Sequence, residues 1–180
     1  ASQLQEVDIA DLLGRDEITP VEELLHQDID GQTILVTGAG GSIGSELCRE
    51  ILSNSPKLLV LLELNEFSLY HAERRFRSLS SIPIVPCLGS VQDSELLKHL
   101  LHDHKVNTVY HAAAYKHVPL VEENPLQGLR NNALGTQSLI EKCIEAEVNS
   151  FVLISTDKAV RPTNVMGASK RIAEMIVQDT

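Results

Sequence analysis

The feature that most constrains the fold of this chain is a regular alternation of short apolar segments with longer amphipathic ones. The apolar segments are continuous runs rich in Val, Ile or Leu, which is typical of strands buried on both faces. We expect strands at 33–37, 57–62, 84–88, 107–112 and 151–155, and helices near 42–53, 66–79, 93–104, 126–147 and 167–178. This alternation predicts an α/β fold, a doubly wound parallel sheet with helices on both faces.

The two ends of the chain differ from this pattern. Thr19, Pro20 and Glu22 form a capping-box arrangement that predicts the start of a short helix. Residues 1–30 are therefore interpreted as a helical N-terminal extension or linker, and 31–180 as the domain. Because the chain stops within an amphipathic stretch, with no further strand, we expect a fragment of a longer protein whose C-terminal substrate lobe is absent.

Composition excludes several classes of protein. A chain of 180 residues is long enough for one well-buried domain, and its net charge of −10 leaves no basic face for nucleic acid. The longest apolar run, which begins at Leu58, is far shorter than the ~20 residues that a membrane span needs. We therefore expect a cytoplasmic domain without a nucleic-acid partner and without a membrane span of its own.

Cysteine and histidine give no metal-binding pattern. Cys48, Cys87 and Cys143 are odd in number and lie among apolar neighbours, which is typical of reduced thiols in a core. His102 and His104 are two residues apart and would point to different faces of a helix. We expect no metal site.

A glycine-rich loop follows the first expected strand. In "TGAGGSIGSELCRE" the glycines stand at 38, 41 and 44, with a further one at 40, and a helix begins directly after them. Such a loop lets the backbone lie close to a pyrophosphate, which the free N–H groups of the helix N-terminus bind. We predict a Rossmann-like cofactor site; the alternative is a glycine-rich turn without a ligand. The expected contacts from this loop are Thr37, Gly38, Gly41, Ser42, Ile43 and Gly44.

An acidic residue ends the second expected strand. Glu63 lies about 20 residues beyond the glycines, where a carboxylate can bind both hydroxyls of an adenosine ribose. This position favours NAD, and Asn65 is expected beside it. NADP stays open, because a 2′-phosphate would need a nearby cation and Arg74 and Arg75 lie a helix away. The alternative for Glu63 is a solvated loop acid.

Four stretches together resemble a known family. "TGAGGSIG", "HAAAYKHVPLVEENP", "NNALGT" and "STDKAVRPTNVMGASKR" are similar to the extended short-chain dehydrogenase/reductase superfamily, and within it to bacterial polysaccharide-biosynthesis nucleotide-sugar 4,6-dehydratases. The resemblance covers about 31–180. It implies a UDP-sugar substrate and, in the full-length protein, a homo-oligomer. "DLLGRDEI" also resembles the segment that joins the membrane region of the large members to their soluble domain, so the parent is expected to be anchored at the inner membrane.

The resemblance also implies a reaction. The C4 hydroxyl of the sugar is oxidised, water leaves across C5 and C6, and the stored hydride returns to C6. By resemblance, Thr156 matches the hydroxyl of the catalytic triad, Asp157 the acid for the leaving hydroxyl, and Lys158 the group that handles the C5 proton. Their position after the fifth strand agrees, because open α/β sheets bind ligands at that edge. The alternative is a surface ion pair between Asp157 and Lys158.

The catalytic tyrosine of the superfamily is replaced in this chain by Met166. A thioether has no proton to give, so Met166 cannot act as the base. The large members of the branch share this replacement, so it does not imply a dead enzyme. Asp157, Lys158, Thr156 or a water are candidates for deprotonating the C4 hydroxyl. Lys170 keeps its spacing of four residues and is expected to hold the nicotinamide ribose.

Further positions take their expected roles from the resemblance. Ala112, Ala113 and Ala114 match small residues that let the cofactor pass close to the backbone. Ser90 stands where an aspartate commonly meets adenine, so a backbone contact from Val91 is the safer expectation. Asn131 or Asn132 matches the structural asparagine, the alternative being an ordinary helix asparagine. The expected substrate contacts are Lys116, which is also assigned to the cofactor, His117, Asn164 and Val165.

Three functions remain open on this basis. The first is the cofactor-binding and catalytic half of a UDP-N-acetylhexosamine 4,6-dehydratase. The second is a nucleotide-sugar 4-epimerase, which needs no elimination and would not need the Asp157–Lys158 pair. The third is a non-catalytic module that senses a dinucleotide.

Overall fold

The computed structural model describes residues 21, 23 and 27–180 of the chain. Thr19, Pro20 and Glu22, on which the predicted N-terminal helix depends, lie outside these residues, so that helix stays a prediction. The described part begins to pack against the domain before the predicted boundary at Gly31. Ile29 is buried in the core, and the Asp28 carboxylate accepts a hydrogen bond of 2.7 Å from Ser150 Oγ.

The sheet of the described chain has five strands, all parallel to their neighbours. They are β1 (Thr33–Thr37), β2 (Leu58–Glu63), β3 (Ile84–Leu88), β4 (Thr108–His111) and β5 (Ser150–Leu153), in the order β3-β2-β1-β4-β5. The order reverses at β1, which pairs with β2 on one side and β4 on the other. This confirms the predicted doubly wound sheet, and the reversal marks the point where such sheets bind ligands.

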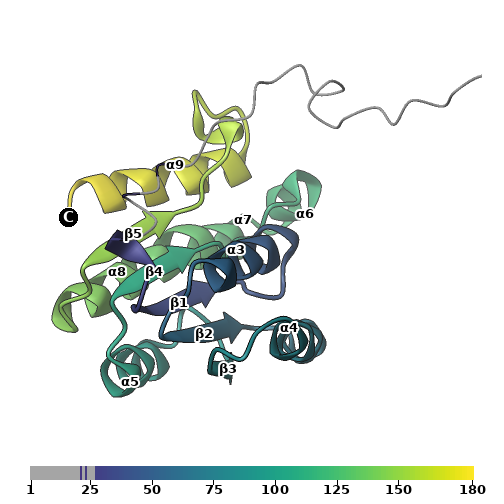
Figure 1. The fold of residues 1–180 in the computed structure, drawn as a ribbon. Helices are drawn as coiled ribbons and strands as arrows, with labels where there is room; N and C mark the ends of the chain where they lie inside the picture. Colours follow the sequence, from purple (N-terminus) through teal and green to yellow (C-terminus); the bar gives the residue numbers. More distant parts are fainter. Residues whose placement is uncertain (1–20, 22, 24–26) are drawn as a thin grey trace, which may run out of the picture.

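Helices cover both faces of the sheet (Figure 1). The first pair, α3 (Ser42–Ser53) and α4 (Glu66–Leu79), lies on one face, and α5 (Ser94–His104) and α8 (Gly135–Glu145) lie on the other. Successive side chains of β1 point to opposite faces of the sheet, as in any β-strand. Ile34 and Val36 belong to one buried apolar cluster, and Leu35 belongs to the other. Both clusters are therefore built from the continuous apolar runs of the sequence.

The region after β4 is more divided than the sequence predicted. Instead of one helix over 126–147, the chain forms α6 (Val118–Glu123), α7 (Pro125–Leu129), a π-helical turn η1 (Arg130–Leu134) and then α8. Pro119 and Pro125 lie in the first turns of α6 and α7, where a missing N–H costs nothing. The π turn contains Asn131 and Asn132, and both are buried.

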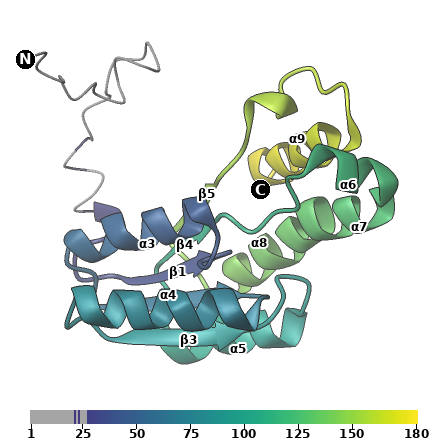
Figure 2. The ribbon, with the colours of Figure 1, turned by 90° about the vertical axis from the view of Figure 1, so that its right-hand side faces the viewer.

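The last helix lies beside this region. A short 3₁₀ turn, η2 (Asp157–Ala159), leads from β5 to α9 (Val165–Gln178), which packs against α7, η1 and α8. Figure 2 shows α6 and α7 beyond the carboxyl ends of the strands. The Asn164 side chain caps α9 by accepting a hydrogen bond of 2.8 Å from Gly167 N.

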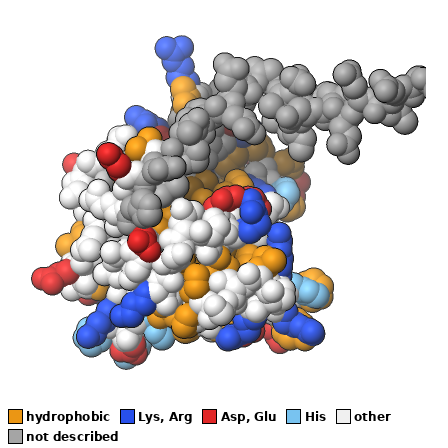
Figure 3. All heavy atoms as spheres, in the orientation of Figure 1, with side chains coloured by type: hydrophobic (Ala, Val, Ile, Leu, Met, Phe, Trp, Pro, Cys, Tyr) orange, Lys and Arg blue, Asp and Glu red, His pale blue; other side chains and the backbone are white. Residues whose placement is uncertain are grey.

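The surface gives no sign of a basic patch on the face seen in Figure 3, where acidic and basic side chains are interspersed. Among the described residues, no helix is both long and apolar enough to cross a bilayer. The same residues contain no group of three or more His, Cys, Asp or Glu side chains placed to hold a metal. Cys48 and Cys143 are buried in the core, where burial raises the pKa of the Cys143 thiol to about 12.

Candidate functional site

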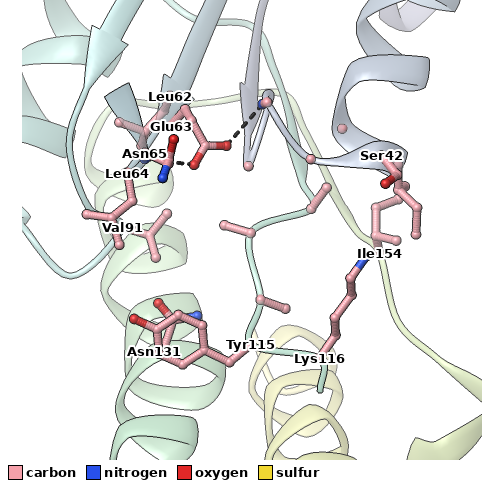
Figure 4. A pocket seen from close by; sticks show the side chains of 18 of the residues that line it. Ser42, Leu62, Glu63, Leu64, Asn65, Val91, Tyr115, Lys116, Asn131 and Ile154 are labelled. Atoms are coloured by element: carbon pink, nitrogen blue, oxygen red, sulfur yellow. Dashed lines mark hydrogen bonds between the residues drawn. The ribbon is translucent and has the colours of Figure 1, made fainter. Parts of the chain in front are cut away.

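A cavity of about 620 Å³ opens at the carboxyl edge of the sheet. Its walls come from the segments that follow all five strands, together with Asn131 of η1 and the first two turns of α9. Figure 4 shows Glu63 at one end of the cavity, and Tyr115 beside Asn131. The charged residues of its lining are one acid, Glu63, and three lysines, Lys116, Lys158 and Lys170. This local excess of cations, in a chain of net charge −10, suits an anionic ligand.

The glycines of the first loop are required by close contacts within the protein. Gly38 has φ +66°, and a Cβ there would lie 2.8 Å from the backbone of Ala113. A Cβ at Gly44 would lie 2.0 Å from the Gly38 carbonyl oxygen. Because both obstacles are backbone atoms, neither can move aside cheaply. The loop therefore folds tightly against the chain that follows β4.

The N-terminus of α3 is open toward this cavity. Its N-cap residue, Gly41, has no side chain to accept hydrogen bonds from the first turn. In contrast, the side chains of Asn65, Asp93 and Asn164 cap α4, α5 and α9. Ser42, Ile43 and Gly44 of the first turn line the cavity. Free N–H groups and the positive end of the helix dipole at this point are suited to a phosphate.

Glu63 is held in place by the backbone. Its Oε2 accepts a hydrogen bond of 3.0 Å from Gly40 N, and its Oε1 accepts one of 3.0 Å from Asn65 N (Figure 4). The carboxylate therefore links the glycine loop to the start of α4 and faces the cavity with a fixed orientation. Carboxylate oxygens accept more than one hydrogen bond each, so both can still bind hydroxyl groups.

Thr37 does not reach the cavity, because it takes part in a buried chain of hydrogen bonds. The Thr136 hydroxyl donates to the Asn132 carbonyl, so it must accept from Nε2–H of His111. Nδ1 of the neutral imidazole then carries no proton and accepts from the Thr37 hydroxyl. Burial lowers the pKa of His111 to about 3, which keeps the ring neutral. Thr37 therefore joins β1, β4 and α8 and lies outside the cavity lining, and its predicted contact with the cofactor stays a prediction.

The two asparagines of η1 have different partners. Asn132 is buried, accepts a hydrogen bond of 2.8 Å from Tyr115 N and donates one of 2.9 Å to Tyr115 O. It also donates to Ser169 Oγ of α9. Asn131 lines the cavity and donates to Asn132 Oδ1. Of the two asparagines that the sequence left open, Asn132 is the one that braces the segment after β4.

The polar group after β5 stands at the rim of the cavity. Thr156 and Lys158 line it, whereas Asp157 is exposed outside the lining. Asp157 Oδ1 accepts from Thr156 Oγ1 at 2.9 Å and lies 3.2 Å from Lys158 Nζ. The Thr156 hydroxyl, followed by Lys158, lowers the pKa of the Asp157 carboxyl, so it is ionised at neutral pH. Because both side chains are exposed, this ion pair adds little to the stability of the domain.

Met166 and Lys170 lie one helical turn apart on α9, and both line the cavity. The Met166 side chain is almost completely buried. Lys170 Nζ donates a hydrogen bond of 2.7 Å to the carbonyl oxygen of Ile154. Burial lowers the pKa of this ammonium group, and the negative charge of Glu174 opposes that effect.

The cavity brings together most of the residues that the sequence predicted. The predicted residues outside its lining are Thr37, Asp157, His117, Asn164 and Val165. Asn164 and Val165 are engaged at the start of α9, where Val165 N donates to Glu122 Oε1 at 2.6 Å. Sequence reasoning missed other lining residues, namely Leu62, Leu64, Ser68, Gly89, Tyr115, Ile154 and Ser155. Five of these, Leu62, Leu64, Gly89, Tyr115 and Ser155, could have been found, because each directly adjoins a predicted site residue.

The parallel sheet and the cavity at its carboxyl edge define a Rossmann-like domain of the short-chain dehydrogenase/reductase type. A family model described as "Polysaccharide biosynthesis protein" matches residues 34–180. The chain belongs to this polysaccharide biosynthesis family, which confirms the resemblance seen in the sequence.

Curated relatives agree with this assignment. The chain is 48% identical over 179 residues to the capsular polysaccharide biosynthesis protein CapD of Staphylococcus aureus. This alignment covers 98% of this chain and 30% of CapD. It is 33% identical over 150 residues to a UDP-N-acetylglucosamine 4,6-dehydratase (inverting) of Campylobacter jejuni, covering 81% of this chain and 42% of that enzyme. A UDP-glucose 4-epimerase of Rickettsia rickettsii is 30% identical over 150 residues, an alignment that covers 81% of this chain and 42% of the epimerase. The chain thus spans less than half the length of each of these relatives.

Solved structures share the fold. Pen from Bacillus thuringiensis superposes with a TM-score of 0.79 at 27% identity, covering 84% of this chain and 47% of that one. The dTDP-glucose 4,6-dehydratase DesIV from Streptomyces venezuelae, solved with NAD bound, gives a TM-score of 0.70 at 23% identity, covering 82% and 51%. At that lower identity the likeness to DesIV establishes the fold alone.

Proposed function

We propose that this domain is the cofactor-binding and catalytic half of a nucleotide-sugar 4,6-dehydratase that acts on a UDP-N-acetylhexosamine. One observation carries the proposal: a single cavity joins the open N-terminus of α3 and Glu63 to Thr156, Lys158 and Lys170. The first two features suit a dinucleotide, and the last three supply proton-transferring and cationic groups. The relationship to a UDP-N-acetylglucosamine 4,6-dehydratase is consistent with this reaction.

The cofactor that fits is NAD. The uncapped first turn of α3 offers N–H groups to the pyrophosphate, and the fixed carboxylate of Glu63 offers acceptors to a ribose with two free hydroxyls. A 2′-phosphate would meet the negative charge of Glu63 without a compensating cation. Arg74 and Arg75 are absent from the lining, and Arg74 donates to Tyr70 Oη on the outside of α4. The cofactor, when bound, would accept a hydride from C4 of the sugar and return it to C6.

The cofactor choice can be tested directly. Titration of the domain with NAD⁺ and with NADP⁺ should show the tighter binding for NAD⁺. Glu63→Gln should narrow the ratio of the two affinities, because it removes the charge that repels the 2′-phosphate. Glu66→Gln, three residues further on at the start of α4, is the matched control, since Glu66 does not line the cavity. Equal affinities for the two cofactors in the unchanged protein would contradict the proposal.

The chain's own residues account for the proton transfers. Asp157 is ionised, so it must gain a proton before it can protonate the departing C6 hydroxyl. We assign that proton to the C4 hydroxyl, which loses it during oxidation, so a single carboxylate serves as base and then as acid. Lys158 would take the proton from C5 as a neutral amine, so its ammonium proton must first pass to solvent, and it would return the proton to C5 once the hydride has reached C6. Lys170 would donate to the nicotinamide ribose, and Met166 would pack beneath the cofactor without exchanging a proton.

The runner-up is a nucleotide-sugar 4-epimerase. The Rickettsia relative carries that name, and an epimerase would use the same fold and cofactor. An epimerase needs no acid for a leaving hydroxyl, so the Thr156–Asp157–Lys158 cluster favours the dehydratase. A non-catalytic sensing module remains the third possibility, because Met166 stands where the superfamily has its tyrosine.

The decisive experiment uses the full-length protein that contains this domain. Incubation with UDP-N-acetylglucosamine should yield a product lighter by one water molecule, detected by mass spectrometry. An epimerase would change the stereochemistry at unchanged mass, which NMR of the sugar distinguishes. Unaltered substrate with intact NAD⁺ binding would favour the sensing module.

We further propose that the full-length protein is a homo-oligomer anchored at the inner membrane, with this domain on the cytoplasmic side.

A further inference from the structure

Two residues of α9 hold the chain that leaves β5. Lys170 and Glu174 are one helical turn apart, so their side chains share a face of the helix. Lys170 Nζ donates to the carbonyl oxygen of Ile154, and Glu174 Oε1 accepts from the hydroxyl of Ser155. From the opposite side, Ile154 N donates to the His111 carbonyl oxygen at 3.0 Å. The segment that carries Thr156 to Lys158 is thereby fixed between β4 and α9.

Glu174 keeps its charge in this position. Its second oxygen, Oε2, accepts a hydrogen bond of 2.8 Å from Arg171 Nη1. The Ser155 hydroxyl and then Arg171 lower the pKa of the carboxyl, so it is ionised throughout the neutral range. The negative charge of Glu174 opposes the lowering of the Lys170 pKa by burial, and the charge of Lys170 adds to the lowering of the Glu174 pKa.

We propose that Glu174 is a positioning residue of the site, whose carboxylate fixes Ser155 and sustains the positive charge of Lys170. Ser155 and Lys170 line the cavity, whereas Glu174 does not. It therefore acts on the cofactor through these two neighbours. The inference rests on the proposed function, because the charge on Lys170 matters only if Lys170 meets a cofactor.

Other ionisable groups surround Lys170 and bear on its charge. The ring of His111 on β4 is neutral and adds no charge of its own. The Asp157–Lys158 pair contributes opposite charges that offset each other at a distance. The ionisable groups to consider around Lys170 are thus Glu174 and Arg171 on α9, His111 on β4, Lys116 after β4, and Asp157 and Lys158 after β5.

The first test follows the titration of Lys170 itself and needs no cofactor. NMR of ¹³C-labelled lysine side chains, with Lys170 assigned from the Lys170→Arg spectrum, gives the Lys170 pKa in each variant. Glu174→Gln keeps the size and an oxygen to accept from Ser155 but loses the charge. The Lys170 pKa should then fall below its value in the unchanged protein, as expected for loss of a neighbouring opposite charge.

Three comparison variants separate charge from structure. Ser155→Ala removes the hydrogen bond but leaves the charge of Glu174, so the Lys170 pKa should change little. Glu73→Gln makes the same charge change on α4, where Glu73 pairs with Arg77 at 2.9 Å, and should leave Lys170 unaffected. Glu174→Asp keeps the charge, so the Lys170 pKa in this variant should lie close to that in the unchanged protein. If Glu174→Gln folds poorly, the double variant Ser155→Ala/Glu174→Gln, which removes the charge together with the hydrogen-bond partner, is measured in its place. An unchanged Lys170 pKa in folded Glu174→Gln would overturn the proposal.

The second test follows NAD⁺ affinity against pH. If Lys170 must be protonated, affinity is full below its pKa and is lost as the pH rises through it. Glu174→Gln should therefore lose NAD⁺ affinity at a lower pH than the unchanged protein. The control Glu73→Gln should lose it at the same pH as the unchanged protein. If the unchanged protein fails to bind NAD⁺, the proposed function fails, while the NMR titration still decides the role of Glu174. If NAD⁺ binds and both pH profiles coincide, the inference about Glu174 is wrong and the proposed function stands.

Discussion

Thr37 Oγ1 lies 2.6 Å from His111 Nδ1, at the ends of two neighbouring strands. This hydrogen bond, together with the one to Thr136, fixes the tautomer of a fully buried imidazole directly behind the cavity. The glycine loop after β1 and the small residues after β4 begin within three residues of this pair. The walls that would receive a cofactor are therefore set by a buried polar contact between adjacent strands.

His111 should make the stability of the domain depend on pH. Its pKa is lowered to about 3 in the folded state, against 6.5 for a free histidine, so the unfolded state binds more protons between these values. Stability should therefore fall as the pH drops below 6.5, by roughly 2 kcal/mol between pH 7 and pH 5 from this group. Urea unfolding at several pH values measures the slope. His111→Gln should reduce it, whereas His99→Gln, at an exposed position, should not.

Gly44→Ala should disrupt the glycine loop more than Gly41→Ala. The new methyl group would lie 2.0 Å from the Gly38 carbonyl oxygen at position 44, but 3.3 Å from it at position 41. We expect a loss of ~1–3 kcal/mol of stability or more for Gly44→Ala, as for other overpacked sites, and a smaller loss for Gly41→Ala. Thermal unfolding of both variants shows which of them loses more stability. A Gly44→Ala protein as stable as the Gly41→Ala protein would show that the loop can yield.

Asn132→Ala should destabilise the domain more than Asn131→Ala. Removing Asn132 leaves both Tyr115 backbone groups and the Ser169 hydroxyl without the hydrogen bonds they now make to it. The expected cost is roughly 1–3 kcal/mol, because part-buried polar groups lose their hydrogen-bond partner. Chemical denaturation measures it. Since Asn131 lines the cavity, its replacement should affect NAD⁺ affinity more than stability, and the opposite ranking would contradict the bracing role of Asn132.

Asp157→Ala and Lys158→Ala should each lower turnover of the full-length protein by roughly 10²–10⁴-fold, as the loss of a general acid or base does. NAD⁺ affinity should stay nearly unchanged, because neither residue is assigned to the cofactor. Lys142→Ala, which removes another exposed ion pair, is the matched control. Turnover is measured as the loss of water from UDP-N-acetylglucosamine. Full activity in either variant would show that Asp157 and Lys158 form only a surface ion pair without a catalytic role.

Met166→Tyr should not increase activity. Met166 is almost completely buried on α9, and the neighbouring Gly167 already lies so close to Lys158 that a Cβ would be 2.2 Å from its carbonyl oxygen. A larger ring at position 166 would crowd this turn, so we expect a loss of turnover and some loss of stability. A large gain in rate would show that the tyrosine was lost without replacement, and the assignment of proton transfer to Asp157 would fail.

The sequence by itself determined the architecture and most of the cavity. Continuous apolar runs such as 33–37 predicted strands buried on both faces, and the glycines from 38 to 44 predicted the loop after the first of them. Glu63, at the end of the second strand, and Lys170, four residues after Met166, both line the cavity, and their roles toward a cofactor stay predictions. These features depend on local pattern, which a sequence displays directly.

Tertiary structure decided what local pattern could not. The burial of Thr37 against His111, the division of the helix after β4 by a π turn, and the choice of Asn132 over Asn131 all depend on contacts between distant segments. The link from Glu174 to Ser155 joins residues that are 19 apart in sequence and come from different elements. Spacing along a chain can predict which residues share a face or an edge. Only packing shows which of them meet, because hydrogen-bond partners are chosen by the three-dimensional approach of elements that the sequence treats separately.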